Sequence, residues 1–143
     1  MTQPQRLLFL DYDGVLHATH ATATQRFNRT DLLAQALEGI DCDIVVSSSW
    51  RFHHQPAEMI GPLPAALRER VIGATGPAAF GRWPRYREIR AFLDVTGPNI
   101  PWRALDDAWT EFPPGCPELI ACNPNVGLDV AQLQALAQRA RGP

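Results

Sequence analysis

The sequence contains no lysine, no dense run of basic residues and no long apolar segment. With a formal net charge of -2, the chain has no overall positive field that would hold nucleic acid without sequence preference. No stretch approaches the roughly 20 apolar residues that a membrane helix needs, and the first residues lack the apolar core of a signal peptide. These absences argue against export and against a membrane partner.

Cysteine is also scarce, since Cys42, Cys116 and Cys122 are the only ones. Their odd number argues against a disulfide framework, and their spacing does not fit a metal site. We therefore expect free thiols in a reducing cytoplasm.

Length and composition predict one domain over residues 1–143. Hydrophobic residues make up 45% and charged residues 20% of the chain, as in ordinary soluble globular proteins. A chain of 143 residues is long enough for one buried core but short for two.

Short apolar runs alternate with helical patterns along the chain. Runs that are apolar throughout are typical of strands buried on both faces of a parallel sheet. The predicted strands comprise residues 6–10, 43–47, 71–74, 102–105 and 118–122. The predicted helices comprise residues 30–37, with Thr30 as N-cap, residues 65–70 and 86–95, and a last helix begun by Asp129. This alternation predicts an α/β fold with helices on both faces of the sheet.

Polar side chains stand directly after three of the predicted strands. They are Asp11 and Asp13, Ser47 and Ser48, and Asp106 and Asp107. Because ligands of open α/β sheets bind beyond the carboxyl ends of the strands, one crevice should collect them all. Four carboxylates in one place repel one another unless a hard cation lies among them, and oxygen ligands suit Mg²⁺. The sequence therefore predicts an Mg²⁺ site formed by Asp11, Asp13, Asp106 and Asp107.

These residues also predict phosphate chemistry. Asp11 can attack phosphorus as a carboxylate nucleophile, forming an aspartyl-phosphate that water then hydrolyses. Asp13 can protonate the leaving oxygen as general acid and afterwards draw a proton from water as general base. Gly14 permits a sharp turn that brings backbone N–H groups toward the phosphoryl oxygens.

Further residues are candidates for binding the phosphoryl group. A hydroxyl of Ser47 or Ser48 can donate to a phosphoryl oxygen, and Arg85 or Arg87 can neutralise developing charge. Arg51 is another candidate, although a structural ion pair is the commoner role for such an arginine.

Ordinary structural roles compete with several of these interpretations. Asp and Gly favour turns, and either serine can cap the following helix. Trp50 fits a core position, whereas Trp109, next to the acidic pair, can shape a pocket. His17 lies just past the first aspartates, where it can touch a substrate.

Three segments resemble motifs of one superfamily. The first, Leu-Leu-Phe-Leu-Asp11-Tyr-Asp13-Gly14-Val-Leu, resembles the first motif of the haloacid dehalogenase-like (HAD) superfamily. Residues 45–51 resemble its second motif and residues 104–107 its fourth, in the right order. The Ser-Ser-Trp-Arg sequence, the Asp-Asp strand end and residues 125–128 resemble small bacterial HAD domains related to those of multi-domain RNA repair proteins.

The resemblance implies a single Rossmann-like three-layer domain with a five-stranded parallel sheet in the order 5-4-1-2-3 and no sizeable cap. It also implies that Asp11 is the nucleophile and Asp13 the acid/base. Mg²⁺ would be held by Asp11, the backbone carbonyl of Asp13 and the fourth motif. Because the usual lysine of the third motif is missing, Arg85 is the first candidate to replace it and Arg87 the alternative.

The sequence thus predicts an Mg²⁺-dependent phosphomonoester hydrolase that acts through an aspartyl-phosphate on Asp11. By analogy with other capless members, an open site favours a large phosphorylated substrate, such as a nucleic-acid end or a phosphoprotein. Two alternatives stay open. One is a phospho-accepting receiver-like signalling domain, and the other is a non-catalytic phosphate-binding module, suggested by the missing lysine.

Overall fold

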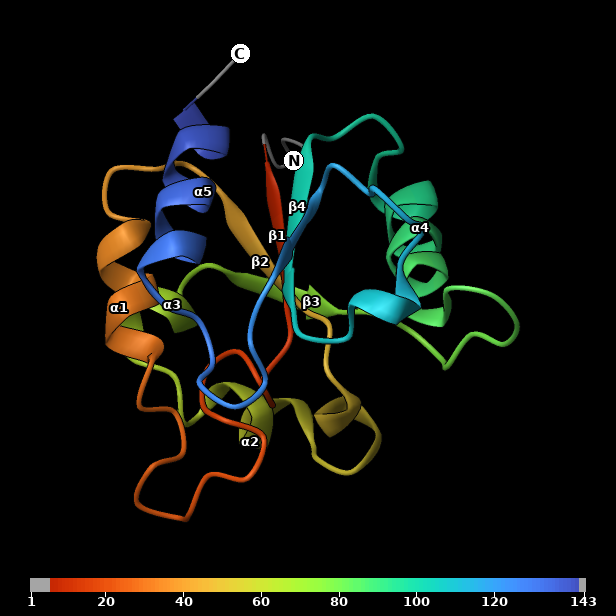
Figure 1. Cartoon of the computed structure of the whole chain (residues 1–143). Coiled ribbons are helices and arrows are strands. Elements are labelled where there is room, and N and C mark those ends of the chain that lie inside the picture. Colours follow the sequence, from red (N-terminus) through yellow and green to blue (C-terminus); the bar gives the residue numbers. More distant parts are fainter. Residues whose placement is uncertain (1–5, 142–143) are drawn as a thin grey trace.

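A five-stranded parallel sheet runs through the computed structural model, which describes residues 6–141 (Figure 1). The strands are β1 (Leu7–Leu10), β2 (Asp43–Val46), β3 (Val71–Ala74), β4 (Trp102–Asp106) and β5 (Leu119–Ala121). They lie in the order β3-β2-β1-β4-β5, and every neighbouring pair is parallel. This arrangement confirms the predicted Rossmann-like α/β fold and its strand order.

Helices cover both faces of the sheet and make three layers. Helices α1, α3 and α5 lie on one side of it, and α4 lies on the other (Figure 1). The α-helices are α1 (Thr30–Ala36), α2 (Pro56–Ile60), α3 (Ala65–Arg68), α4 (Pro84–Thr96) and α5 (Val130–Arg141). Two single turns of 3₁₀-helix, η1 (Ser49–Phe52) and η2 (Trp109–Glu111), follow β2 and β4. No helix within residues 6–141 is long and apolar enough to cross a membrane.

The two faces of the sheet are buried in two separate hydrophobic clusters. Successive side chains of a strand point to opposite faces, so Leu8 and Leu10 join one cluster while Leu7 and Phe9 join the other. The second cluster includes Ile89 of α4. Burial on both faces explains why the central strand β1 is apolar along its whole length.

The carboxyl ends of the strands form an ordered row. Leu10 is in register with Val46 and with Leu105, and Val46 is in register with Ala74. The residues that follow these four positions therefore also form a row. In order across the sheet they are Asp106, Asp11, Ser47 and Thr75. Backbone N–H groups continue the ladder here, from Asp11 to Leu105 O at 3.1 Å, from Ser47 to Leu10 O at 2.8 Å and from Thr75 to Val46 O at 2.9 Å. The row places four polar side chains along one edge, on the side of α4.

Some predicted boundaries differ from the structure. Thr30 is the first residue of α1 rather than its N-cap, and its Oγ1 donates to Phe27 O at 2.9 Å. Helix α4 begins at Pro84, because proline's fixed φ suits the first turn. Helix α2 was not predicted, since one short turn carries no periodic pattern. The start of α2 is held by a hydrogen bond from Gln55 N–H to Glu58 Oε1 at 2.7 Å, as in a capping box.

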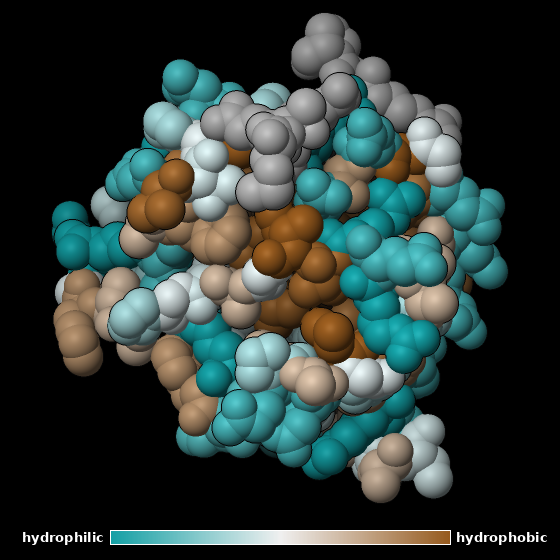
Figure 2. Space-filling model, turned by 180° about the vertical axis from the view of Figure 1, so that it is seen from behind, coloured by the Kyte–Doolittle hydropathy of each residue, from teal (hydrophilic) through white to brown (hydrophobic). Residues whose placement is uncertain are grey.

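The connections after β1 and β2 contain no cap domain within the described residues. The chain between β1 and α1 consists of turns and one isolated bridge, between Asp13 and His17, and the chain between β2 and β3 contains η1, α2 and α3. Seen from behind, the surface carries a hydrophobic patch near its middle, with hydrophilic residues around much of it (Figure 2). The strand ends are flanked by turns, η1 and the short helices α2 and α3.

Candidate active site

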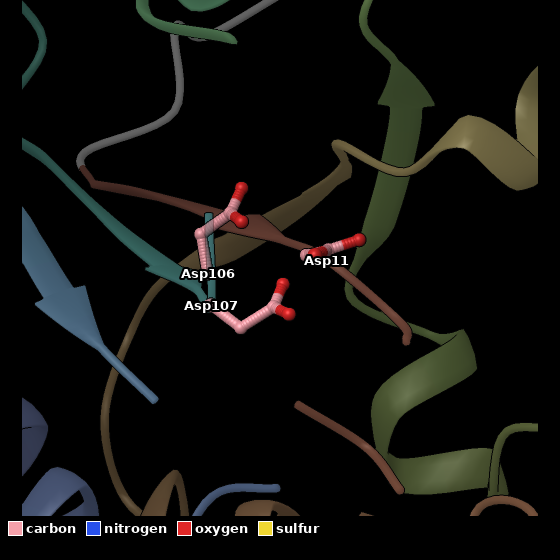
Figure 3. A group of neighbouring side chains, drawn as sticks. All are labelled: Asp11, Asp106 and Asp107. Carbon is pink, nitrogen blue, oxygen red and sulfur yellow. The ribbon is translucent and has the colours of Figure 1, made fainter. Parts of the chain in front are cut away.

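Three carboxylates converge at the ends of the central strand β1 and its neighbour β4. Asp11 follows β1, Asp106 ends β4 and Asp107 comes next, and an oxygen from each lies within 4.8 Å of the others (Figure 3). Asp11 is 5% exposed and Asp106 only 1% exposed. The cluster contains three carboxylates instead of the four expected from the sequence, because the Asp13 side chain lies outside it.

Burial shapes the electrostatics of this cluster. It raises the pKa of Asp11 well above its ordinary value, and the negative charge of Asp106 raises it further, while Arg85 opposes both. Burial also raises the pKa of Asp106 to about 6, against the lowering effects of Arg85 and of the Ala108 N–H group. Three carboxylates with one guanidinium leave an excess of negative charge. An all-oxygen donor set with that excess fits a hard divalent cation such as Mg²⁺.

Arg85 supplies the positive charge beside the cluster. It lies in the first turn of α4, its side chain is 11% exposed, and its Nε is 3.4 Å from Asp106 Oδ2. Its Nη1 donates to the backbone carbonyl of Ser47. Arg87, two residues further on, is exposed and donates to Phe80 O at 3.4 Å. Of the two arginines considered for the missing lysine, Arg85 is the one that contacts the cluster.

Asp13 is held by two aromatic side chains outside the cluster. Its Oδ1 is 2.8 Å from His17 Nε2, and its Oδ2 accepts from Trp50 Nε1 at 3.1 Å. The ring atom His17 Nδ1 accepts from the Phe27 N–H group at 3.1 Å, so Nε2 carries the proton and donates to Asp13. With 45% of its side chain exposed, Asp13 is oriented by these bonds and still accessible.

His17 and Trp50 therefore orient the Asp13 side chain, and the sequence did not reveal these two contacts. The expectation that His17 touches the substrate is wrong, because its side chain is 2% exposed and both ring nitrogens are bonded within the protein. The available signal was the spacing of Asp13 and His17, four residues apart in one tight loop.

Both the backbone conformation at position 14 and the space around it require a glycine. Its φ is +79°, a region that favours glycine. A Cβ at this position would collide with Asp107 Oδ2 and lie 2.9 Å from Asp107 Cβ. The glycine therefore allows the loop after β1 to pack against one of the clustered carboxylates.

The two adjacent serines have different environments. Ser48 Oγ accepts from Trp50 N–H at 3.2 Å and caps η1, which is the ordinary structural role. Ser47 is 1% exposed, and its Oγ has no hydrogen-bond partner among the described residues. This hydroxyl beside the carboxylates lacks the hydrogen bond that buried hydroxyls almost always make.

A family model described as the HAD domain in Swiss Army Knife RNA repair proteins matches residues 7–133. The chain belongs to this HAD family. No curated protein and no solved structure matches the chain. Family membership assigns a phosphohydrolase-type fold and agrees with the resemblance seen in the three motifs.

The topology also separates this HAD domain from the receiver-like alternative. Receivers have the flavodoxin-like strand order 2-1-3-4-5, in which β1 and β3 are neighbours. Here β1 lies between β2 and β4, and β3 is an edge strand. The crevice at the strand ends is therefore built from different strands in the two folds.

Arg51 of the HAD domain forms bonds with protein groups through all three of its nitrogens. They go to Gly76 O at 2.9 Å, to Ser48 O at 2.9 Å and to Glu88 Oε1 at 2.8 Å. The Arg51 and Glu88 side chains are 6% and 9% exposed. This network ties η1 to α4 and to the loop after β3, and it matches the structural ion pair rather than the phosphate-binding role suggested for Arg51.

This buried pair yields a stability prediction. Glu88→Gln should lower the free energy of unfolding by about 3 kcal/mol, because it leaves the Arg51 charge buried without a counter-charge. The measurement is urea unfolding at neutral pH. The matched control is Asp94→Asn on the same helix, whose pair with Arg90 spans 3.9 Å between side chains that are 67% and 37% exposed. That variant should change stability by less than about 0.5 kcal/mol. Equal losses in the two variants would contradict the buried-pair argument.

Proposed function

We propose that this HAD domain is an Mg²⁺-dependent phosphomonoester hydrolase that acts through an aspartyl-phosphate on Asp11. The observation that carries the proposal is the convergence of Asp11, Asp106 and Asp107 beside Arg85 at the ends of the central strands. Such a buried acidic cluster is stable only with a compensating cation or with protons, and a phosphoryl group supplies further oxygen ligands to Mg²⁺.

The reaction follows from the placement of the two aspartates. A carboxylate oxygen of Asp11 attacks phosphorus, the ester P–O bond breaks, and Asp13 gives a proton to the leaving oxygen. Asp13, again a carboxylate, then takes a proton from water as the water oxygen attacks phosphorus, which releases phosphate and restores Asp11. His17 and Trp50 hold Asp13 in one orientation throughout.

Other residues stabilise the charge that develops on the phosphoryl group. The Ser47 hydroxyl and the Arg85 guanidinium donate to its oxygens, and the backbone around Gly14 approaches from the opposite loop. Bound Mg²⁺, held by Asp11, Asp106 and Asp107, would supply charge neutralisation and orientation. In this arrangement Arg85 takes the place of the lysine that the chain lacks.

For the substrate we propose a phosphorylated nucleic-acid end. The matching family is named for the HAD domain of RNA repair proteins. The site also lacks a cap within the described residues, so a large substrate can itself exclude water from it. We place the reaction in the cytoplasm, because all three cysteines are free thiols.

A phosphatase screen tests this proposal. Purified protein with Mg²⁺ is given oligonucleotides phosphorylated at the 5′ or the 3′ end, a phosphopeptide and small phosphate esters, and released phosphate is measured. We expect kcat/KM for one oligonucleotide end to exceed that for the phosphopeptide at least about tenfold, as one well-bound group would provide. Binding of the ends without any turnover would instead favour the non-catalytic phosphate-binding module.

A further inference from the structure

Thr75 continues the row of polar side chains beyond the catalytic cluster. It follows β3 directly, as Ser47 follows β2, and its N–H donates to Val46 O at 2.9 Å. Thr75 is 4% exposed, and its Oγ1 has no hydrogen-bond partner among the described residues. Buried hydroxyls are almost always bonded, so an unbonded one beside an active site indicates a missing partner.

A hollow of about 330 Å³ lies beside Thr75. Thr75 lines it together with Phe52, His54, Met59 and Pro77. The Phe52 ring is 49% exposed, and the Arg51 guanidinium lies over it at 4.0 Å. The hollow thus combines an accessible aromatic ring and apolar walls with a single buried hydroxyl, a composition typical of pockets for small planar groups.

Three contacts connect this hollow to the catalytic residues. His54 stacks on Trp50 with ring centroids 4.5 Å apart and planes 18° apart, and Trp50 donates to Asp13. Arg51 donates to the backbone of Ser48, and Thr75 is bonded to the strand that leads into Ser47. The Thr75 side of the hollow is therefore separated from Asp11 by one intervening strand, β2.

We propose that this hollow binds the base of the nucleoside that carries the phosphate, stacked on Phe52 and hydrogen-bonded to Thr75 Oγ1. The inference rests on the proposed function and specifies its substrate. Every base has a π-face that stacks on an aromatic side chain, and base edges carry donors and acceptors for a hydroxyl. Each nitrogen of Arg51 donates a hydrogen bond to the protein, to Gly76, Ser48 or Glu88.

The test compares two oligonucleotides that differ only at the phosphorylated end, one with its terminal base and one with an abasic terminal nucleotide. Wild type should prefer the base-containing end by about tenfold in kcat/KM, as expected for one stacked base. Phe52→Ala and Thr75→Val should each reduce this preference to about twofold, mainly through KM. Thermal unfolding of each variant checks its fold, and the half-exposed Phe52 keeps the test valid if Thr75→Val does not fold.

The matched control is Phe80→Ala. Phe80 is 85% exposed and lines neither this hollow nor a second one, which is lined by Trp83 and Trp109, so this variant should keep the wild-type preference. Equal kcat/KM of wild type for the two oligonucleotides would overturn the proposal that the hollow binds the base, and it would leave the phosphatase proposal intact. Loss of the preference in Trp109→Ala but not in Phe52→Ala would assign the base to the second hollow, near Trp83, and also overturn the inference. Absence of turnover with either oligonucleotide would overturn the proposed function itself.

Discussion

Asp11→Asn is expected to lower kcat/KM for phosphate release by at least about 10⁴-fold while the protein remains folded. The amide has nearly the shape of the carboxylate but is a poor nucleophile, so the aspartyl-phosphate cannot form. Asp11 is 5% exposed and lies beside Asp106, and its ionised form is disfavoured there. Removing this charge should therefore leave the stability of the metal-free protein equal to or above that of wild type.

The measurement combines a phosphate-release assay with thermal unfolding of both proteins. Asp94→Asn is the matched control, since it makes the same chemical change at a side chain that is 67% exposed on α4. Equal activity of wild type and Asp11→Asn would refute the mechanism. Mapping the residue labelled by a small phosphodonor is an independent check, and a label on Asp106 or Asp107 would contradict the assignment of Asp11 as the nucleophile.

Removal of Mg²⁺ should have the second largest effect. A chelator is expected to reduce turnover by at least about 10³-fold, because the phosphoryl oxygens and the acidic cluster would lose their common counter-charge. Added Mg²⁺ should restore activity, and it should raise the melting temperature of wild type by mass action on the folded state. A melting temperature that does not respond to Mg²⁺ at pH 8 would contradict the metal site.

The pH dependence of the metal-free protein follows from Asp106. Burial raises its pKa from 3.8 to about 6, so between these values the folded state holds a proton that the unfolded state has released. Stability should therefore fall as the pH rises from about 4 to about 6, by an amount on the order of 2 kcal/mol. Above this window Asp106 is ionised, and the stabilisation by Mg²⁺ should accordingly be larger at pH 8 than at pH 5.

Comparison with Asp106→Asn isolates this contribution from the other titrating groups. Urea unfolding in chelator at several pH values should show a smaller decrease in this variant, and Mg²⁺ should stabilise it less than wild type. If the free energy of unfolding depends on pH and on Mg²⁺ in the same way in wild type and in Asp106→Asn, Asp106 is not the residue that couples proton binding to metal binding.

The sequence by itself determined the sheet and the location of the site. Each strand is an apolar run of a few residues that ends at polar side chains, and these two local features predict a buried parallel sheet with a polar edge. Asp11, Ser47 and Asp106 were found in this way, each directly after or at the end of a strand. Weakly periodic pieces were not found: α2 and the two 3₁₀ turns are single turns with no repeat for a pattern to show.

Only the tertiary structure decided among neighbouring residues of the same type. It places Arg85 rather than Arg87 against the cluster, leaves the hydroxyl of Ser47 unbonded while Ser48 caps a turn, and separates Asp13 from the other carboxylates. It also brings Thr75, which no motif contains, into the same row. The reason is physical: local periodicity fixes which face of an element a residue occupies, whereas its partners come from segments dozens of positions away, and their distances exist only once the sheet has assembled.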